Sequence, residues 1–183
     1  MNQNRIIFLM GPKHSGKTST GRALAAELNE KFSDLDELVE METGKTPRTL
    51  YKEGSGIFQK AEAIALHNIF LKNENCVIAA GGGLIDNVQA MEILQDHPEA
   101  VLVYLEVSAE TAWKRIIDNS ADGELPAFLD RANPQESHYR IHTARAEKYR
   151  AAAGLIIPAE NKTPQTLAKE IAGKLNKMQT AMR

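Results

Sequence analysis

The sequence predicts an α/β fold, a three-layer sandwich in which a parallel sheet of about five strands lies between layers of helices. Short apolar runs alternate with helix-forming segments along the chain, which is typical of parallel strands joined by helical crossovers. In addition, the segment from Gly11 to Thr18 stands between an apolar run and a helix-forming run and matches the pattern G-x-x-x-x-G-K-[ST]. At 183 residues without an internal repeat, residues 1–183 are expected to form a single domain.

The segment from Gly11 to Thr18 is interpreted as a phosphate-binding loop. A strand, a tight turn and a helix N-terminus together direct backbone N–H groups and the positive end of a helix dipole at one point, where an anion can bind. We expect Lys17 to reach the β- and γ-phosphates of a nucleoside triphosphate and the Thr18 hydroxyl to coordinate Mg²⁺. The other nucleotide-binding candidates in this segment are Gly11, Lys13, His14, Ser15, Gly16 and Ser19.

Composition excludes several classes of partner. A net charge of −2 leaves no excess of cations for nucleic-acid binding. No run approaches the roughly 18 apolar residues of a membrane span, and the first apolar run is too short and too early for a secretion signal. The single cysteine, Cys76, cannot form an internal disulfide and fits a reducing compartment. We therefore expect a cytoplasmic monomer that binds neither nucleic acid nor membrane.

Asp34 and Asp36 follow a short apolar segment, residues 32–35, that is expected to form a strand. Ligands of open parallel sheets bind beyond the carboxyl ends of the strands, and alternate residues of a strand share a face. Both carboxylates are thus expected to point towards the site of the phosphate loop. Helix capping or simple exposure to solvent is the alternative interpretation.

Three consecutive glycines, residues 81–83, follow the apolar run at residues 76–80. The run predicts a central strand that is buried on both faces. Glycines directly after it indicate that the backbone approaches a ligand closely or adopts positive φ, with a plain flexible turn as the alternative.

Helix boundaries carry further predictions. Thr46 and Pro47 are typical of an N-cap and a first helical position, and Asp86 with Gln89 resembles a capping box. Residues 118–131 lose helical periodicity and are interpreted as a mobile lid that closes over a bound nucleotide.

His138 and His142 lie four residues apart in an expected helix, a spacing compatible with metal binding. A third ligand and a general base of the kind found in metal hydrolases are missing from the surrounding sequence, so a solvated helix face is the favoured interpretation.

Taken together, these segments resemble the shikimate kinase family of P-loop phosphotransferases, and the resemblance covers most of the chain. It implies a fold of the P-loop NTPase type, similar to nucleoside-monophosphate kinases. Its motifs are the phosphate loop followed by Thr20-Gly21-Arg22, the segment Phe32-Ser33-Asp34-Leu35-Asp36, Gly44 and Gly54 before Phe58 and Glu62, the turn Gly81-Gly82-Gly83, and Arg145 four residues before Tyr149.

The resemblance implies transfer of the γ-phosphate of ATP to a hydroxyl of shikimate, giving 3-phosphoshikimate for aromatic amino-acid biosynthesis. Asp34 would hold Mg²⁺ through water, and Asp36 would bind and orient the acceptor hydroxyl, in addition serving as its base. Positioning and charge neutralisation are what phosphoryl transfer chiefly requires, and Lys17 and Mg²⁺ would neutralise the charge. Arg115 and Lys162 would flank the adenine, although an exposed helix arginine is the alternative for Arg115. The acceptor-binding segment would span residues 34–62, and the candidates for acceptor binding are Asp36, Gln59, Glu62, Gly81, Gly82, Gly83 and Arg145.

Three positions depart from the family pattern. His14 stands where the family usually has glycine, and Gln59 and Leu125 stand where it has arginines that bind the acceptor and the transferred phosphate. A neutral amide lacks both the charge and the two-pronged geometry of a guanidinium. Two alternatives therefore stay open, a paralogue that phosphorylates another polyol or hydroxy acid, and a nucleotide-binding regulatory protein without catalysis. Candidates to replace the missing cations are Lys60, Arg131 and Arg140.

Overall fold

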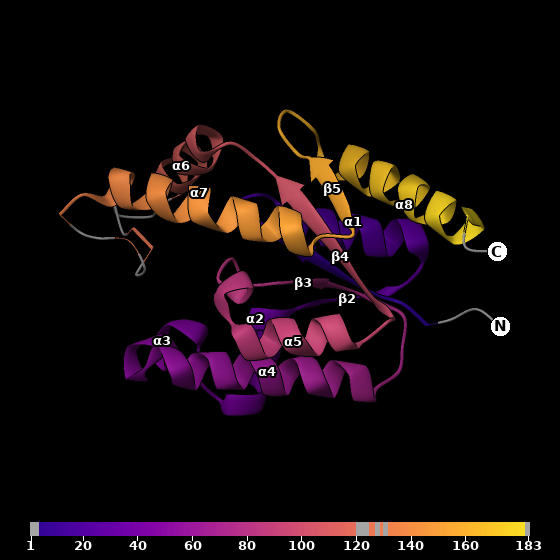
Figure 1. The fold of residues 1–183 in the computed structure, drawn as a ribbon, viewed down its shortest axis with the longest axis horizontal. Helices are drawn as coiled ribbons and strands as arrows, with labels where there is room; N and C mark the ends of the chain where they lie inside the picture. Colours follow the sequence, from indigo (N-terminus) through magenta and orange to yellow (C-terminus); the bar gives the residue numbers. More distant parts are fainter. Residues whose placement is uncertain (1–3, 120–124, 127–128, 130–131, 182–183) are drawn as a thin grey trace.

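The structure, a computed structural model, describes residues 4–119, 125–126, 129 and 132–181. Five parallel strands form one sheet in the order β2-β3-β1-β4-β5, and helices cover both of its faces (Figure 1). The predicted α/β sandwich is thereby confirmed. Most of the expected lid at residues 118–131, including Arg131, lies outside the described residues. The strands are β1 (Ile6–Met10), β2 (Lys31–Asp34), β3 (Cys76–Ala79), β4 (Ala100–Glu106) and β5 (Leu155–Pro158).

The helices divide between two hydrophobic clusters, one on each face of the sheet. Side chains of β1 alternate, so that Ile6, Phe8 and Met10 enter one cluster while Ile7 and Leu9 enter the other. Helices α1 and α8 lie side by side over the second cluster, and α4 and α5 cover the first (Figure 1). The helical elements are α1 (Lys17–Leu28), α2 (Leu35–Thr43), α3 (Pro47–Glu53), α4 (Ser55–Leu71), the 3-10 helix η1 (Leu84–Asp86), α5 (Val88–Asp96), α6 (Ala109–Asp118), α7 (Pro134–Ala152) and α8 (Pro164–Ala181).

Strand order places the phosphate loop at the centre of the sheet. The chain leaves β1 and forms β2 and β3 on one side, then crosses to form β4 and β5 on the other. In open parallel sheets, ligands bind at the carboxyl ends of the strands where the direction of winding changes. The loop after β1 and the triple glycine after β3 both lie at this edge.

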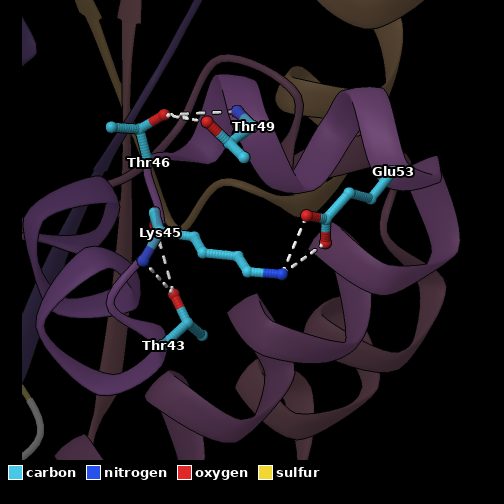
Figure 2. Close-up of polar contacts among 5 residues, drawn as sticks. All are labelled: Thr43, Lys45, Thr46, Thr49 and Glu53. Atoms are coloured by element: carbon cyan, nitrogen blue, oxygen red, sulfur yellow. Dashed lines mark hydrogen bonds and ion pairs between the residues drawn. The ribbon is translucent and has the colours of Figure 1, made fainter.

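Figure 2 shows the junction between α2 and α3, which the sequence predicted correctly. Gly44, with φ 68°, ends α2, and the Thr46 hydroxyl accepts a hydrogen bond from the backbone N–H of Thr49 at 3.2 Å. The ammonium of Lys45 donates to both carboxylate oxygens of Glu53 at 2.8 and 2.9 Å. Both side chains of this ion pair are substantially exposed, so the cap contributes more to helix stability than the pair does.

The predicted capping box at Asp86 is wrong. Asn87 is the N-cap of α5, and its side-chain oxygen accepts from the backbone N–H of Ala90 at 3.2 Å. Asp86 ends η1 instead, and its carboxylate accepts hydrogen bonds from Arg145 and Lys148 of α7. Two adjacent residues were both suitable caps, and the tertiary contact with α7 determined which one serves.

The prediction of a solvated face at His138 and His142 is also wrong. The two side chains are only 4% and 9% exposed, because this face of α7 packs towards α6. A ring nitrogen of His138 lies 3.0 Å from the carbonyl oxygen of Ala109, the first residue of α6. Across the part of the chain that the structure describes, no group of three potential metal ligands is found. In the same part, none of the helices is long and apolar enough to cross a membrane.

Two helical glycines provide a matched test of the packing between α1 and β2. A Cβ atom at Gly21 would lie 2.5 Å from Cε2 of Phe32, whereas one at Gly173 in α8 would meet no atom within 4 Å. Alanine is favoured over glycine in helices by about 1 kcal/mol. We therefore expect Gly173→Ala to raise the free energy of unfolding by up to about 1 kcal/mol and Gly21→Ala to lower it by about 1–2 kcal/mol, as measured by urea unfolding. Equal stabilisation by both changes would contradict the described packing.

Candidate active site

The phosphate loop joins β1 to α1 through two glycines that other residues could not replace. Gly11 has φ 149°, and a Cβ atom there would lie 2.8 Å from the carbonyl oxygen of Leu105 in β4. Gly16 has φ 94° and is the N-cap residue of α1. The loop therefore packs tightly against the neighbouring strand, and the N-terminus of α1 faces the carboxyl edge of the sheet.

Lys17 lies at the centre of the site. Its ammonium donates to the loop carbonyls of Gly11 and Pro12 at 3.0 and 2.8 Å. Burial lowers the pKa of Lys17 to about 8, although Asp36 and Asp34 oppose this effect because negative charge favours the ammonium. The lysine is therefore mainly charged at neutral pH and lies within electrostatic reach of both aspartates.

Thr18 and Asp34, the two residues predicted to bind Mg²⁺, are in direct contact. The Thr18 hydroxyl donates to Oδ2 of Asp34 at 2.9 Å, and Oδ1 of Asp34 accepts from the backbone N–H of Asp36 at 3.1 Å. Asp34 is thus both the N-cap of α2 and a neighbour of the phosphate loop. A hydroxyl and a carboxylate are oxygen ligands of the kind that Mg²⁺ prefers, so these side chains fit that ion.

Asp36 belongs to a helix, whereas the sequence predicted that it follows Asp34 on a strand. β2 ends at Asp34 and α2 begins at Leu35, so Asp36 belongs to the first turn of a helix and does not share a strand face with Asp34. The prediction of strand alternation is wrong for this pair. The two carboxylates are nevertheless close neighbours, because capping by Asp34 fixes the first turn of α2.

Asp36 and Glu62 face the same point beside Gly81. A Cβ atom on Gly81 would lie 3.1 Å from Oδ1 of Asp36 and 3.3 Å from Oε1 of Glu62. Within the described residues, neither of these buried oxygens has a hydrogen-bond partner. The first glycine of the turn therefore leaves room for two carboxylate oxygens that can accept hydrogen bonds from a bound molecule.

Burial also controls the charge of these two carboxyl groups. It raises the pKa of Asp36, and the neighbouring Asp34 raises it further. It raises the pKa of Glu62 to about 7, although a hydrogen bond from the Asn87 amide, 3.1 Å from Oε2, acts in the opposite direction. The same Asn87 amide donates to the backbone carbonyl of Gln59 at 2.8 Å, which fixes this turn of α4 against α5.

Tyr149 connects the two loops, a role that the sequence did not predict. Its buried hydroxyl lies 2.7 Å from the carbonyl oxygen of Gly82 and 3.2 Å from that of Gly11. Its ring stacks on Tyr104 of β4 with the centroids 5.0 Å apart. In the sequence, the only signal for Tyr149 was its position four residues after Arg145.

Arg145 lies beside the triple glycine, as predicted. Its Nη2 atom is 3.7 Å from the position that a Cβ on Gly83 would take. Its Nε donates to Asp86 at 2.7 Å, and the second carboxylate oxygen of Asp86 accepts from Lys148 at 2.6 Å. Lys13 and Tyr149 line the same pocket as Arg145. On the side of α7, the site is thus bordered by the cations Arg145 and Lys148 and by the carboxylate of Asp86.

The remaining predicted residues lie at the periphery. Arg115 of α6 donates from Nη1 to the backbone carbonyl of His14 at 3.1 Å, so it supports the phosphate loop directly. Lys162 pairs with Glu170 of α8 at 2.7 Å, and no contact in the described residues joins it to the loop. Ser19 donates to the carbonyl of Gly16 at 3.1 Å within the first turn of α1.

The raised pKa of Glu62 predicts a pH dependence of stability. An ordinary glutamate in the unfolded chain loses its proton near pH 4.5, whereas Glu62 in the folded protein holds it until about pH 7. Because the folded state binds the proton more tightly, stability falls as pH rises between these values, by about 3 kcal/mol in total. We expect Glu62→Gln to flatten this part of the stability profile in urea unfolding. The control Glu92→Gln, at an exposed position of α5, should leave the profile unchanged, and an unchanged profile in both variants would contradict the assignment.

Comparison with known proteins agrees with this site. The family model for shikimate kinase matches residues 13–176. A shikimate kinase of Streptococcus gordonii is 32% identical over 165 residues, which cover 90% of this chain and 96% of the relative. One of Psychrobacter arcticus is 29% identical over 171 residues, covering 93% and 88% of the two chains.

A solved structure agrees in fold. The shikimate kinase of Acinetobacter baumannii, in complex with shikimate, superposes with a TM-score of 0.81 at 29% identity and covers 95% of this chain and 94% of its own. The family match, the relatives and the site geometry lead to one conclusion: the chain belongs to the shikimate kinase family and is a phosphotransferase with a hydroxyl group as acceptor.

Proposed function

We propose that this chain transfers the γ-phosphoryl group of ATP to a hydroxyl of shikimate, forming 3-phosphoshikimate. One observation is the main support for the proposal. Lys17 lies within electrostatic reach of Asp34 and Asp36 at the carboxyl edge of the sheet, and Oδ1 of Asp36 is a buried acceptor without a hydrogen-bond partner among the described residues. Family membership supports the reaction type. The relative from Acinetobacter baumannii, whose structure is a complex with shikimate, supports the acceptor.

On the donor side, the phosphate loop binds the triphosphate through its backbone N–H groups and the N-terminus of α1. Lys17 supplies positive charge to the phosphate oxygens, which accumulate charge in the transition state. Thr18 and Asp34 would hold Mg²⁺ on the same side, and this ion would supply the remaining charge neutralisation when bound. Because Lys17 is buried among loop carbonyls, its ammonium is already oriented towards the phosphate site.

On the acceptor side, Asp36 accepts a hydrogen bond from the reacting hydroxyl and orients its oxygen for in-line attack. Phosphoryl transfer has a loose transition state, so orientation matters more than complete removal of the proton. Glu62 and Gly81 form the floor of this part of the site. Arg145 supplies the nearby positive charge for a carboxylate, and Gln59, one helical turn before Glu62, would contribute neutral hydrogen bonds.

Further parts of the proposal concern the whole chain. Residues 1–183 act as one kinase domain, with acceptor binding over residues 34–62 and a lid over residues 118–131. The protein works as a monomer in the cytoplasm, where ATP and Mg²⁺ are available, and its partner is the small-molecule acceptor. The neutral Gln59 favours a second candidate, a kinase of the same fold whose acceptor is another polyol or hydroxy acid.

Asp36→Asn tests the catalytic assignment. We expect kcat to fall by at least about 100-fold, because the amide cannot accept the hydroxyl proton and orients the hydroxyl less well. ATP affinity, measured by calorimetry, should stay within about threefold, since the phosphate loop is unchanged. Turnover is measured as ADP release in a coupled assay, and Asp96→Asn at an exposed position of α5 is the matched control. Unchanged turnover in Asp36→Asn would contradict the role of Asp36, whereas ATP binding by the native chain without turnover on any acceptor would favour a regulatory protein.

Gln59→Arg tests the identity of the acceptor. If shikimate is the acceptor, a restored guanidinium should lower its KM by about tenfold, because a charge-assisted hydrogen bond is stronger than a neutral one by about 1.4 kcal/mol. The control Gln95→Arg adds the same charge on exposed α5 and should have no effect. Saturable turnover of the native chain with quinate or gluconate, and none with shikimate, would replace shikimate as the acceptor and retain the kinase.

A further inference from the structure

His14 is an unusual residue of the phosphate loop, because it combines a titratable side chain with a left-handed backbone. Its φ is 60°, in the left-handed region that residues other than glycine adopt uncommonly. The guanidinium of Arg115 holds this conformation from α6 by donating to the His14 carbonyl at 3.1 Å. This bond anchors the backbone at His14, and its side chain is half-buried within the phosphate-binding segment.

The charged groups that act on the imidazole are cations from the loop and from two helices. Lys13 and Lys17 belong to the loop and to the start of α1, and Arg115 belongs to α6. Burial lowers the pKa of His14 most, and each of these cations lowers it further. In the protein alone the imidazole is therefore neutral at pH 7.

Lys13 and Lys17 belong to the segment that would bind the phosphates, and Arg115 contacts this segment through the His14 carbonyl. A bound triphosphate brings several negative charges among Lys13, Lys17 and Arg115, and these charges reverse the sign of the field at the imidazole. An imidazolium next to phosphate oxygens can also donate charge-assisted hydrogen bonds, which a neutral ring forms less strongly. Binding of the nucleotide and binding of a proton should therefore favour each other.

We propose that His14 is a phosphate-binding residue of the nucleotide site and takes up a proton when a nucleoside triphosphate binds. This inference rests on the proposed ATP binding and adds a residue and a linked proton to it. As a consequence, nucleotide affinity increases as the pH falls from about 8 towards 6, the range in which histidine titrates.

Calorimetry of Mg-ATP binding tests the inference directly. The titration is performed at pH 7 in two buffers that differ in their enthalpy of ionisation, so that the difference in heat counts the protons bound. His14→Asn is the test variant, because asparagine tolerates the left-handed conformation but does not titrate. We expect the native chain to bind at least about 0.3 more protons per nucleotide than His14→Asn, since only the native loop titrates in this range. Its affinity should decrease from pH 6 to pH 8 about threefold to tenfold more than that of the variant.

The controls separate the histidine from other sources of protons. Titration of ATP itself contributes equally to all variants and cancels in the comparison. His67→Gln, at an exposed position of α4, should bind as many protons as the native chain. His14→Gly, in which glycine suits the same φ, should behave as His14→Asn does, and a thermal melt of each variant verifies that it is folded.

The outcomes also separate this inference from the proposed function. Equal proton uptake by the native chain and by folded His14→Asn and His14→Gly, with ATP bound and turned over, would overturn the role of His14 and leave the kinase intact. Absence of Mg-ATP binding by the native chain would overturn the proposed function, and the inference with it.

Discussion

The site depends on the buried side chain of Tyr149, which joins two backbone segments that are far apart in the sequence. The Tyr149 hydroxyl lies within hydrogen-bond distance of the carbonyl oxygens of Gly11 and Gly82, and it therefore links the loop after β1 to the turn after β3. A Cβ atom on Gly82 would lie 3.2 Å from the backbone nitrogen of Lys13, so the two loops also touch directly. The relative position of the two loops is consequently fixed by the Tyr149 hydroxyl and by direct backbone packing, and correct relative placement of reacting groups is a main requirement of catalysis.

Local patterns predicted the donor side of the site well. Gly11, Gly16 and Lys17 follow from one motif, because its backbone conformation and helix N-terminus are properties of consecutive residues. The five-stranded sheet was predictable for a similar reason, since buried parallel strands are apolar along their whole length. The contact between Thr18 and Asp34 was also predictable, because the sequence places both residues at the carboxyl edge of the sheet.

Features that depend on packing between distant elements could not be predicted in this way. Asp86 and Asn87 are equally good caps by composition, and only the position of α7 assigns one to Arg145 and the other to α5. His138 and His142 are polar enough for a solvated face, but their burial depends on where α6 packs. The charge of Glu62 is of the same kind, because burial and the neighbouring Asp36 raise its pKa while Asn87, from another element, lowers it.

Strand order also separates the charges of the site. The loops and helices next to β2 and β3 carry Asp34, Asp36 and Glu62, whereas those next to β1 and β4 carry Lys13, Lys17 and Arg115. Such a division keeps the cations around the phosphates and the carboxylates around the hydroxyls, and Lys17 lies where the two groups meet. This division also causes electrostatic repulsion, because an anionic acceptor must bind beside carboxylates. Burial of Glu62 reduces this repulsion, since a carboxyl group that is partly protonated near neutral pH repels an anion less than a fully ionised one. A cation at position 59, one helical turn before Glu62, would favour the ionised form of this carboxyl group, whereas the neutral Gln59 adds no charge beside it.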